Sequence, residues 1–377
     1  MSSKLFTQFS IGELDLANRI TVAPMCQYSA VDGSMTDWHL MHLGTLAVSG
    51  ASMMLVEATG VTPQGRITPQ CVGLYSDENE AAIKRAIDFC QGISQIRIGI
   101  QLAHAGRKAS TWRPWQGRGP LKPEDGAWET AAPSAVPPAA GWPTPRALDR
   151  AGMVAIRDAF AAAARRAAHI GLDFIELHST HGYLLSEFLS PLSNWRSDEF
   201  GGTLENRMRF PLEVFAALRA AWPKEKPMGA KISGSDFADG GWTPDDAVVY
   251  ARELKKIGCD YVTVSGGGLL LDAKIPVAPG YQVPFAERVK RETGIVTGSV
   301  GLISDPRQAE EIVASGKADF VSLARAMLFD PRWPWHAAVS LGAHIGYPPQ
   351  YERCAPEAWF PGKTLGRLLN TTQNRQD

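Results

Sequence analysis

The sequence has few cysteines, little net charge and no long apolar run. Its five cysteines stand far apart, and no two have the CxxC spacing of zinc ribbons and redox dithiols; they are at positions 26, 71, 90, 259 and 354. Lys and Arg number 38 against 39 Asp and Glu, so a net charge of −1 gives no reason to expect nucleic acid or an acidic membrane as partner. We expect reduced thiols in a cytoplasmic protein, most of them small core residues.

Signals for secretion, membrane insertion and dinucleotide binding are also missing. The first ten residues have no long apolar core, so we expect no secretion signal, and no apolar run has the length needed to span a bilayer. The first strand is not followed by a glycine-rich turn, which a doubly wound nucleotide-binding sheet usually has. The doubly wound sheet remains the alternative fold to the barrel described below.

A unit of helix, glycine and buried strand recurs along the chain. The segments 171–177, 258–264 and 316–323 each begin with glycine, continue into an apolar run, and follow a helical pattern. Glycine is favoured just past a helix because it adopts the left-handed conformation without a Cβ clash. An apolar run after it is typical of a buried parallel strand.

Eight such strands alternate with helices, which predicts an α/β protein with a (β/α)8 TIM barrel, formed as a single domain over 1–377. The strands are expected at 20–25, 53–57, 97–101, 174–177, 228–232, 260–264, 295–298 and 319–323. The helices are expected at 36–49, 77–92, 153–169, 205–221, 245–257, 282–292 and 305–315.

Residues 111–148 interrupt this alternation. They hold eight prolines and four tryptophans and are too long for an ordinary connection, so we expect an excursion over the catalytic face. Trp112, Trp115 and Trp128 either shape the pocket there or pack the loop.

Polar residues follow several of the predicted strands, at the barrel end where catalytic groups gather. The segment 178–183 places two imidazoles and a phenol after one strand, where they could polarise an oxygen and deliver a proton beside it. A pair of histidines that caps the next helix is the alternative. After the last two strands, Gly298, Gly301 and Arg325 would suit a phosphate.

Four motifs resemble the Old Yellow Enzyme family of FMN-dependent ene reductases, over nearly the whole chain. They are 18–28 (NRITVAPMCQY), 101–108 (QLAHAGRK), 178–183 (HSTHGY) and 189–207 (LSPLSNWRSDEFGGTLENR). Within the family, the chain is most similar to the bacterial xenobiotic reductase and thermophilic-like class.

The resemblance implies an FMN at the barrel mouth. Its binding residues would be Pro24, Met25, Cys26, Ala58, Gln101, His178, Lys231 and Gln282, with Val300, Gly301, Ala324 and Arg325 at the phosphate. The cation at position 231, beside flavin N1 and O2, is usually arginine in this family, and lysine lacks the planar two-pronged hydrogen bond. Ala324 replaces a common glycine, at small cost if its φ is negative.

The resemblance also implies the reaction and the subunit arrangement. NADPH or NADH would reduce the flavin, and an electron-poor alkene would then take hydride from it. His178 and His181 would polarise the substrate oxygen, Tyr183 would donate the proton, and Tyr28 would line the pocket. Arg353, in a C-terminal tail at 345–377, would reach a neighbouring subunit, so we expect a homodimer or a dimer of dimers.

Two hypotheses from other classes compete with this one. A metal-dependent barrel hydrolase would use His178 and His181 as ligands, but such sites need three or more ligands and only His104 adds a histidine at a predicted strand end. A non-enzymatic flavin-binding protein would have no need of Tyr183. We therefore expect no metal.

Overall fold

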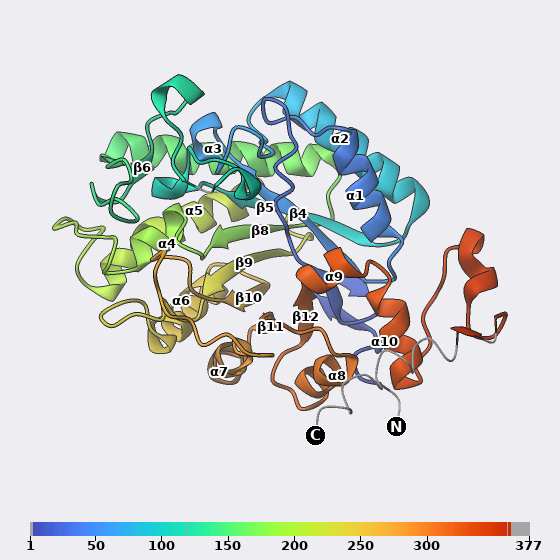
Figure 1. Ribbon diagram of the computed structural model, residues 1–377. Coiled ribbons are helices and arrows are strands. Elements are labelled where there is room, and N and C mark those ends of the chain that lie inside the picture. Colours follow the sequence, from blue (N-terminus) through green and yellow to red (C-terminus); the bar gives the residue numbers. More distant parts are fainter. Residues whose placement is uncertain (1–2, 118, 360, 363–377) are drawn as a thin grey trace.

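Eight parallel strands form a closed barrel in the computed structural model, which describes residues 3–117, 119–359 and 361–362 (Figure 1). Around the barrel the strands are β3 (Ile20–Val22), β4 (Met53–Gly60), β5 (Arg97–Ala103), β8 (Phe174–Ser179), β9 (Met228–Ser233), β10 (Tyr261–Ser265), β11 (Val296–Ser299) and β12 (Phe320–Leu323). Because β12 pairs with β3, no edge is left open. The predicted TIM barrel is confirmed, and the doubly wound sheet is wrong.

Helices surround the barrel, as Figure 1 shows. The seven predicted ones are present within a few residues of their expected bounds, as α1 (Asp37–Ala47), α2 (Asp77–Ile93), α3 (Arg150–Ile170), α5 (Leu204–Ala221), α6 (Pro244–Lys256), α7 (Val283–Thr293) and α8 (Pro306–Ala314). The predicted glycine turns are also confirmed, since Gly171, Gly258 and Gly316 all have φ between +80° and +92°. The sequence did not predict α4 (Leu184–Leu189), α9 (Arg325–Phe329) and α10 (Trp333–Leu341).

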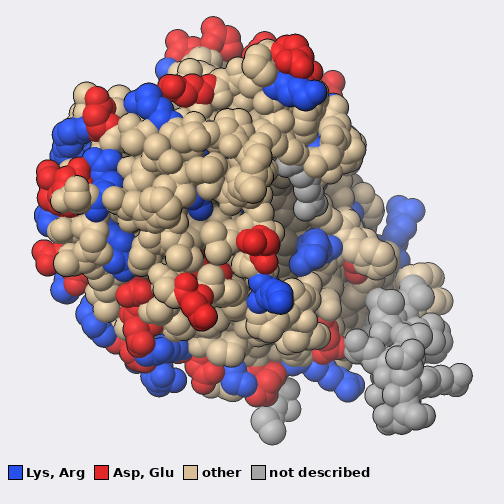
Figure 2. Space-filling model, turned by 60° about the vertical axis from the view of Figure 1, so that its left-hand side comes forward, with Lys and Arg blue, Asp and Glu red and all other residues tan. Residues whose placement is uncertain are grey.

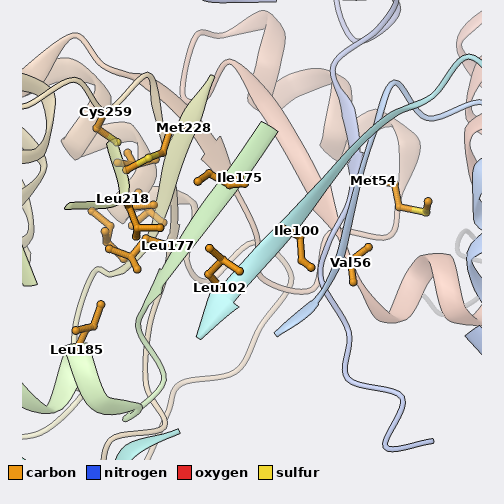
Figure 3. Packing of buried hydrophobic residues seen from close by; sticks show 14 of the residues in the cluster. Met54, Val56, Ile100, Leu102, Ile175, Leu177, Leu185, Leu218, Met228 and Cys259 are labelled. Atoms are coloured by element: carbon orange, nitrogen blue, oxygen red, sulfur yellow. The ribbon is translucent and has the colours of Figure 1, made fainter. Parts of the chain in front are cut away.

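Most of the core lies between the strands and the helices that cover them. Figure 3 shows Ile100 on β5 and Ile175 on β8 in this cluster, together with Leu218 on α5. The buried cysteines Cys90 and Cys259 belong to it as small apolar residues, and all five cysteines are free thiols. The expected use of cysteine as core filling is therefore confirmed for these two positions.

A second cluster fills the N-terminal end of the barrel. An antiparallel hairpin of β1 (Phe9–Ile11) and β2 (Leu14–Leu16), which the sequence analysis did not predict, packs there against the rings of Phe174, Tyr261 and Phe320. Each ring needs a glycine on a neighbouring strand: a Cβ on Gly298 would lie 2.3 Å from the Phe320 ring. Gly298 therefore makes room for packing, and the prediction that it approaches an anion is not supported.

The excursion after β5 is partly ordered as short elements. It holds the 3-10 turns η3 (Pro114–Gln116) and η4 (Pro123–Asp125) and a two-residue parallel pair of β6 (Ala131–Ala132) and β7 (Arg146–Ala147). Figure 1 shows this teal to green segment on the side of the molecule where α4 lies. Within the described residues, no helix is both long enough and apolar enough to cross a membrane.

Candidate active site at the barrel mouth

The carboxyl ends of β8 and β9 bring the predicted catalytic groups together. His178 is paired in register with Lys231 on the neighbouring strand, and both are buried. The ring centroid of His178 lies 5.3 Å from that of His181 and 4.8 Å from that of Tyr183, with the rings edge to face. The three side chains of the 178–183 motif thus form one cluster, and Tyr183, the N-cap residue of α4, makes no side-chain cap hydrogen bond.

Both imidazoles are held in the neutral form. Burial, with the positive charges of Lys231 and Lys108, lowers the pKa of His178 to about 3. Burial and Lys231 likewise hold the pKa of His181 well below its ordinary value. A neutral imidazole has one N–H donor and one acceptor nitrogen, so each ring can donate one hydrogen bond.

The ring nitrogens differ in what they contact. His181 Nε2 lies 2.8 Å from Ser265 Oγ at the end of β10, whereas the buried Nδ1 of His178 has no hydrogen-bond partner. A buried polar atom without a partner is costly, and at a functional site it indicates a group that binds there.

The phenol of Tyr183 stays protonated. Burial raises its pKa well above the ordinary value, and the nearby thiol of Cys26 raises it further. Lys108 Nζ lies 5.1 Å from the centroid of the Tyr183 ring, a cation–π contact that favours a positive charge beside the phenol.

A left-handed turn sets the direction of His181. The φ of His181 is +61° and that of Gly182 is +70°, a conformation that costs a non-glycine residue energy. The turn lies directly on the loop after β10, because a Cβ on Gly182 would come within 2.4 Å of the Gly268 carbonyl oxygen. Lys108 Nζ donates to the carbonyl oxygens of both His181 and Gly268, each at 2.7 Å, and so clamps the two loops together.

Arg107, the residue before Lys108, holds two further segments. Its guanidinium donates to Leu269 O in the loop after β10 and to Val136 O in the excursion, each at 3.2 Å, and its backbone N–H donates to Glu187 Oε1 on α4 at 2.9 Å. Burial raises the pKa of Glu187 to about 8, although Arg107 opposes the shift. We call Arg107 and Lys108 the basic clamp.

A polar layer lies below the histidines inside the barrel. Glu176 on β8 accepts hydrogen bonds from Gln101 Nε2 at 2.7 Å and from Thr263 Oγ1 at 2.8 Å. Burial lowers the pKa of Lys231 while the charge of Glu176 opposes the shift. Lys231 thus adds a buried positive charge to this end of the barrel.

The segment after β3 carries four of the predicted site residues. Pro24, Met25, Cys26 and Tyr28 are half-buried there, and Tyr28 has a left-handed φ of +50°. Burial and the neighbouring Glu57 raise the pKa of the Cys26 thiol well above its ordinary value. A bulge at Glu57 in β4 brings the next residue, Ala58, opposite Gln101 on β5.

The remaining cofactor candidates gather at the ends of β11 and β12. Gly301 has φ +109°, and its place beside Gln282 is so close that a Cβ would lie 3.1 Å from the Gln282 Cβ. Val300 is buried, and the φ of Ala324 is −104°, so the negative φ expected for an alanine at this position is present. Arg325 is exposed at the first position of α9, and its charge opposes the burial-induced rise in the pKa of Tyr281.

These residues suit a flavin phosphate. The neutral imidazoles, the buried Lys231 cation and the unpartnered Nδ1 of His178 lie at one end of the barrel, and Gly301 and Arg325 offer N–H donors and positive charge at its edge. The combination matches an aromatic cofactor with a phosphate tail. Among the residues described, no group of three or more His, Cys, Asp or Glu side chains could hold a metal ion.

Arg353 is the predicted site residue that this chain does not bring to its own mouth. It is exposed in the 3-10 helix η5 (Pro349–Cys354), beside α10 in Figure 1, and Cys354 packs on the cluster around Trp335. The tail at 345–377 is described only in part, because residue 360 and residues 363–377 lie outside the described residues.

Lys108, Ser265, Glu176 and Glu187 are residues of the site to which the sequence analysis gave no role. Lys108 stood inside the 101–108 motif, and Ser265 ends a predicted strand, so position alone could have indicated both. Glu176 and Glu187 carried no such signal, because their roles depend on contacts with residues 75 and 80 positions away in the chain.

Two of the three tryptophans left open by the sequence, Trp115 and Trp128, differ in their contacts. Trp115 lies edge to face with Tyr28, with ring centroids 5.8 Å apart. Trp128 instead donates from Nε1 to Gln64 O at 2.9 Å and packs under Arg66. Both contacts pack the loop. Figure 2 brings forward the left-hand side of Figure 1 and shows charges of both signs interspersed there, around a broad uncharged area.

Known proteins resemble the chain over nearly its full length. The model of the NADH:flavin oxidoreductase / NADH oxidase family matches residues 4–342. An NADPH dehydrogenase from Geobacillus sp. (strain WCH70) is 44% identical over 355 residues, which cover 94% of this chain and 99% of that protein. One from Bacillus subtilis (strain 168) is 39% identical with the same coverage.

Solved structures agree with these relatives. Morphinone reductase superposes with a TM-score of 0.76 at 26% identity and covers 93% of both chains. Its complex with tetrahydroNAD has a TM-score of 0.74, also at 26% identity, and covers 92% of this chain and 93% of that one. The hypotheses of a metal-dependent hydrolase and of a flavin-binding protein without activity are wrong. The chain belongs to the NADH:flavin oxidoreductase / NADH oxidase family, and it is an FMN-dependent oxidoreductase of the Old Yellow Enzyme class.

Proposed function

We propose that the enzyme uses NADPH or NADH to reduce electron-poor C=C bonds, as in enones, enals, maleimides and nitroalkenes. The observation that carries the proposal is the cluster of two neutral imidazoles and a protonated phenol beside a buried cation. When bound, FMN carries hydride from the reduced nicotinamide to the alkene. Relatives named NADPH dehydrogenase support the choice of reductant.

The residues that would hold the flavin are those of the strand ends. Pro24, Met25, Cys26, Ala58, Gln101, Lys231 and Gln282 would surround the ring system, and Val300, Gly301, Ala324 and Arg325 would hold the phosphate. The ammonium of Lys231 supplies positive charge to a ring system that becomes anionic on reduction. Gly301 permits a close approach of its N–H to the phosphate because it has no side chain.

His178 and His181 would hold the substrate by its carbonyl or nitro oxygen. His181 Nε2 lies 2.8 Å from Ser265 Oγ, and in the tautomer that has its proton on Nδ1 the ring can donate that proton to the substrate oxygen. The unpartnered Nδ1 of His178 would supply the second donor. Donors already in place stabilise the negative charge that develops on this oxygen, and removal of one such donor typically costs on the order of 10²–10³ in rate.

Tyr183 would deliver its hydroxyl proton to the α-carbon. Its raised pKa keeps that proton in place at neutral pH, and the Lys108 ammonium beside the ring stabilises the phenolate that remains after transfer. Tyr28 would line the pocket on the side of β3.

A Tyr183→Phe variant tests this assignment. Acid should release FMN from the purified yellow enzyme, and anaerobic stopped-flow should find flavin reduction by NADPH within about twofold of wild type. Oxidation of the reduced enzyme by 2-cyclohexenone should slow by about 10²-fold or more, the typical contribution of a general acid. Tyr75→Phe, which removes a hydroxyl that donates to Asp32 O and has no proposed role in the reaction, is the control. Equal slowing of both half-reactions would remove Tyr183 from the role, and a protein that binds no flavin would end the proposal.

We also propose a homodimer or a dimer of dimers in which Arg353 reaches the neighbouring site. The exposure of Arg353 in η5 supports this proposal. Light scattering of the purified holoenzyme should give at least twice the monomer mass, and Arg353→Ala should raise the KM for the alkene. A monomer with full activity would contradict both statements.

A further inference from the structure

A tryptophan at the mouth has most of its indole in solvent. Trp115 is 63% exposed, although it belongs to a residue type that is usually well buried. Binding residues are disproportionately found on loops held by a rigid scaffold.

The loop that carries Trp115 is fixed at its base. Thr111 and Pro120 form an antiparallel bridge, Trp112 N donates to Gly119 O at 2.9 Å, and the Thr111 hydroxyl donates to Ile67 O at 3.0 Å. These bonds tie residues 111–117 and 119–120 to the loop after β4. The base of the loop therefore has a defined place against the loop after β4.

The indole is held at the tip from two sides. The Arg113 guanidinium lies 5.3 Å from the centroid of the Trp115 ring, and its Nε donates to Gln116 Oε1 at 2.7 Å. Tyr28 meets the indole edge to face, at an interplanar angle of 80°. The planes of both aromatic rings are thus set before any ligand arrives.

Tyr28 continues this pair of rings into the catalytic cluster. It lies at the end of β3, close enough to Tyr183 for its charge to affect the ionisation of that phenol. Tyr28 therefore contacts Trp115 and lies in the neighbourhood of the proposed proton donor.

We infer that Trp115 and Tyr28 form an outer subsite that binds an aromatic ring attached to the reacting alkene. The inference rests on the proposed alkene reduction and adds the substrate class. Two aromatic rings set at a right angle offer a third ring both a face and an edge, the arrangements that aromatic groups prefer. The Arg113 guanidinium already contacts the indole and Gln116. The subsite therefore does not require an anionic group on the aromatic ring of the substrate.

The test compares substrates that differ only by a phenyl group. Crotonaldehyde and cinnamaldehyde carry methyl and phenyl on the β-carbon, and N-methylmaleimide and N-phenylmaleimide carry them away from the double bond. Wild type should have the higher kcat/KM for at least one phenyl member. Trp115→Ala should lower kcat/KM for that member by about three- to tenfold, as expected for one lost aromatic pair, and leave the methyl members within about twofold.

Two further variants control for the loss of an indole. Trp115→Phe keeps a ring at the position and should retain most of the preference. Trp195→Ala removes a tryptophan that is 69% exposed on the loop after α4, and it should behave as wild type. The rate of flavin reduction by NADPH is measured in each variant.

The outcomes separate the two proposals. Equal losses on methyl and phenyl substrates, or a change only in the KM for NADPH, would overturn the subsite, and the second result would assign Trp115 to the nucleotide. If wild type reduces none of the four alkenes, the proposed function itself fails. Reduction of all four without a phenyl-specific effect of Trp115→Ala removes the subsite alone.

Discussion

Lys231 places a positive charge beside two histidines that have to remain neutral. Its neighbour in register, His178, has a pKa lowered to about 3, and the lysine is one cause of that shift. The same charge would face the flavin, where the family usually has arginine. A single residue therefore connects the protonation of the substrate donors with the electrostatics of the cofactor.

Lys231→Arg should bind FMN more tightly and raise its midpoint potential. A guanidinium offers two parallel donors where an ammonium offers one point charge. One added hydrogen bond to a charged group corresponds to about tenfold in the Kd of FMN, and a preference of that size for the reduced form corresponds to about 30 mV for two electrons.

Fluorescence titration of the apoenzyme and spectroelectrochemistry of the holoenzyme measure the two quantities. The control is Lys226→Arg, because Lys226 donates to Leu172 O at 2.7 Å before β9 and lies at the opposite end of the barrel. Unchanged Kd and potential in Lys231→Arg would mean that the difference from the family has no effect.

At the scale of elements, the 181–182 turn decides where the catalytic groups point. It joins β8 to α4, and its backbone touches the loop after β10. Glycine is needed at 182 for two separate reasons, a left-handed φ of +70° and the lack of space for a Cβ.

Gly182→Ala and Gly171→Ala separate these two reasons. Gly171 ends α3 with φ +92°, and a Cβ there would meet nothing within 4 Å. We expect Gly171→Ala to lower the free energy of unfolding by about 1–2 kcal/mol and to keep full activity. Gly182→Ala should lower it further, because of the clash with Gly268, and slow alkene reduction at least tenfold by moving His181 and Tyr183.

Urea unfolding and single-turnover oxidation by 2-cyclohexenone measure these effects. Similar activity of the two variants would show that the close approach to Gly268 does not position the site.

Helices and strands that are marked by a glycine turn or an apolar run were predictable from the sequence. Elements without such a local pattern were not. The glycine at 171 marked the end of α3, and the apolar run after it marked β8. The hairpin of β1 and β2 was missed because three-residue strands are too short to establish a period. The direction of the His178 and Lys231 side chains followed from strand ends, but the contacts of Lys108 depend on loops that meet only in the folded barrel.

At the scale of the whole molecule, buried histidines make stability depend on pH. Burial lowers the pKa of His104 to about 4, from an ordinary value of about 6.5. Below pH 6.5 the unfolded chain takes up a proton at this residue, and the folded chain does so only near pH 4. The free energy of unfolding must therefore fall as the pH drops from 6.5 to 4.

His104→Gln should make this fall less steep, by up to about 1.4 kcal/mol per pH unit, since one proton less is taken up on unfolding. Chemical denaturation of the holoenzyme from pH 8 to 4.5 measures the slope, and the values at pH 8, where histidine is neutral in both states, correct for lost packing. Parallel curves for the variant and wild type would contradict the prediction.

The basic clamp has a consequence for how the loops of this barrel can vary. Two adjacent side chains hold the carbonyls of the 181–182 turn, the loop after β10 and the excursion, so these segments share one tether. Substitutions in two of them should not be additive, because displacing one segment changes what the tether offers the others. The three loops therefore depend on one another. When one of them is replaced by the corresponding loop of a relative, activity should be retained best if the other two loops are replaced with it.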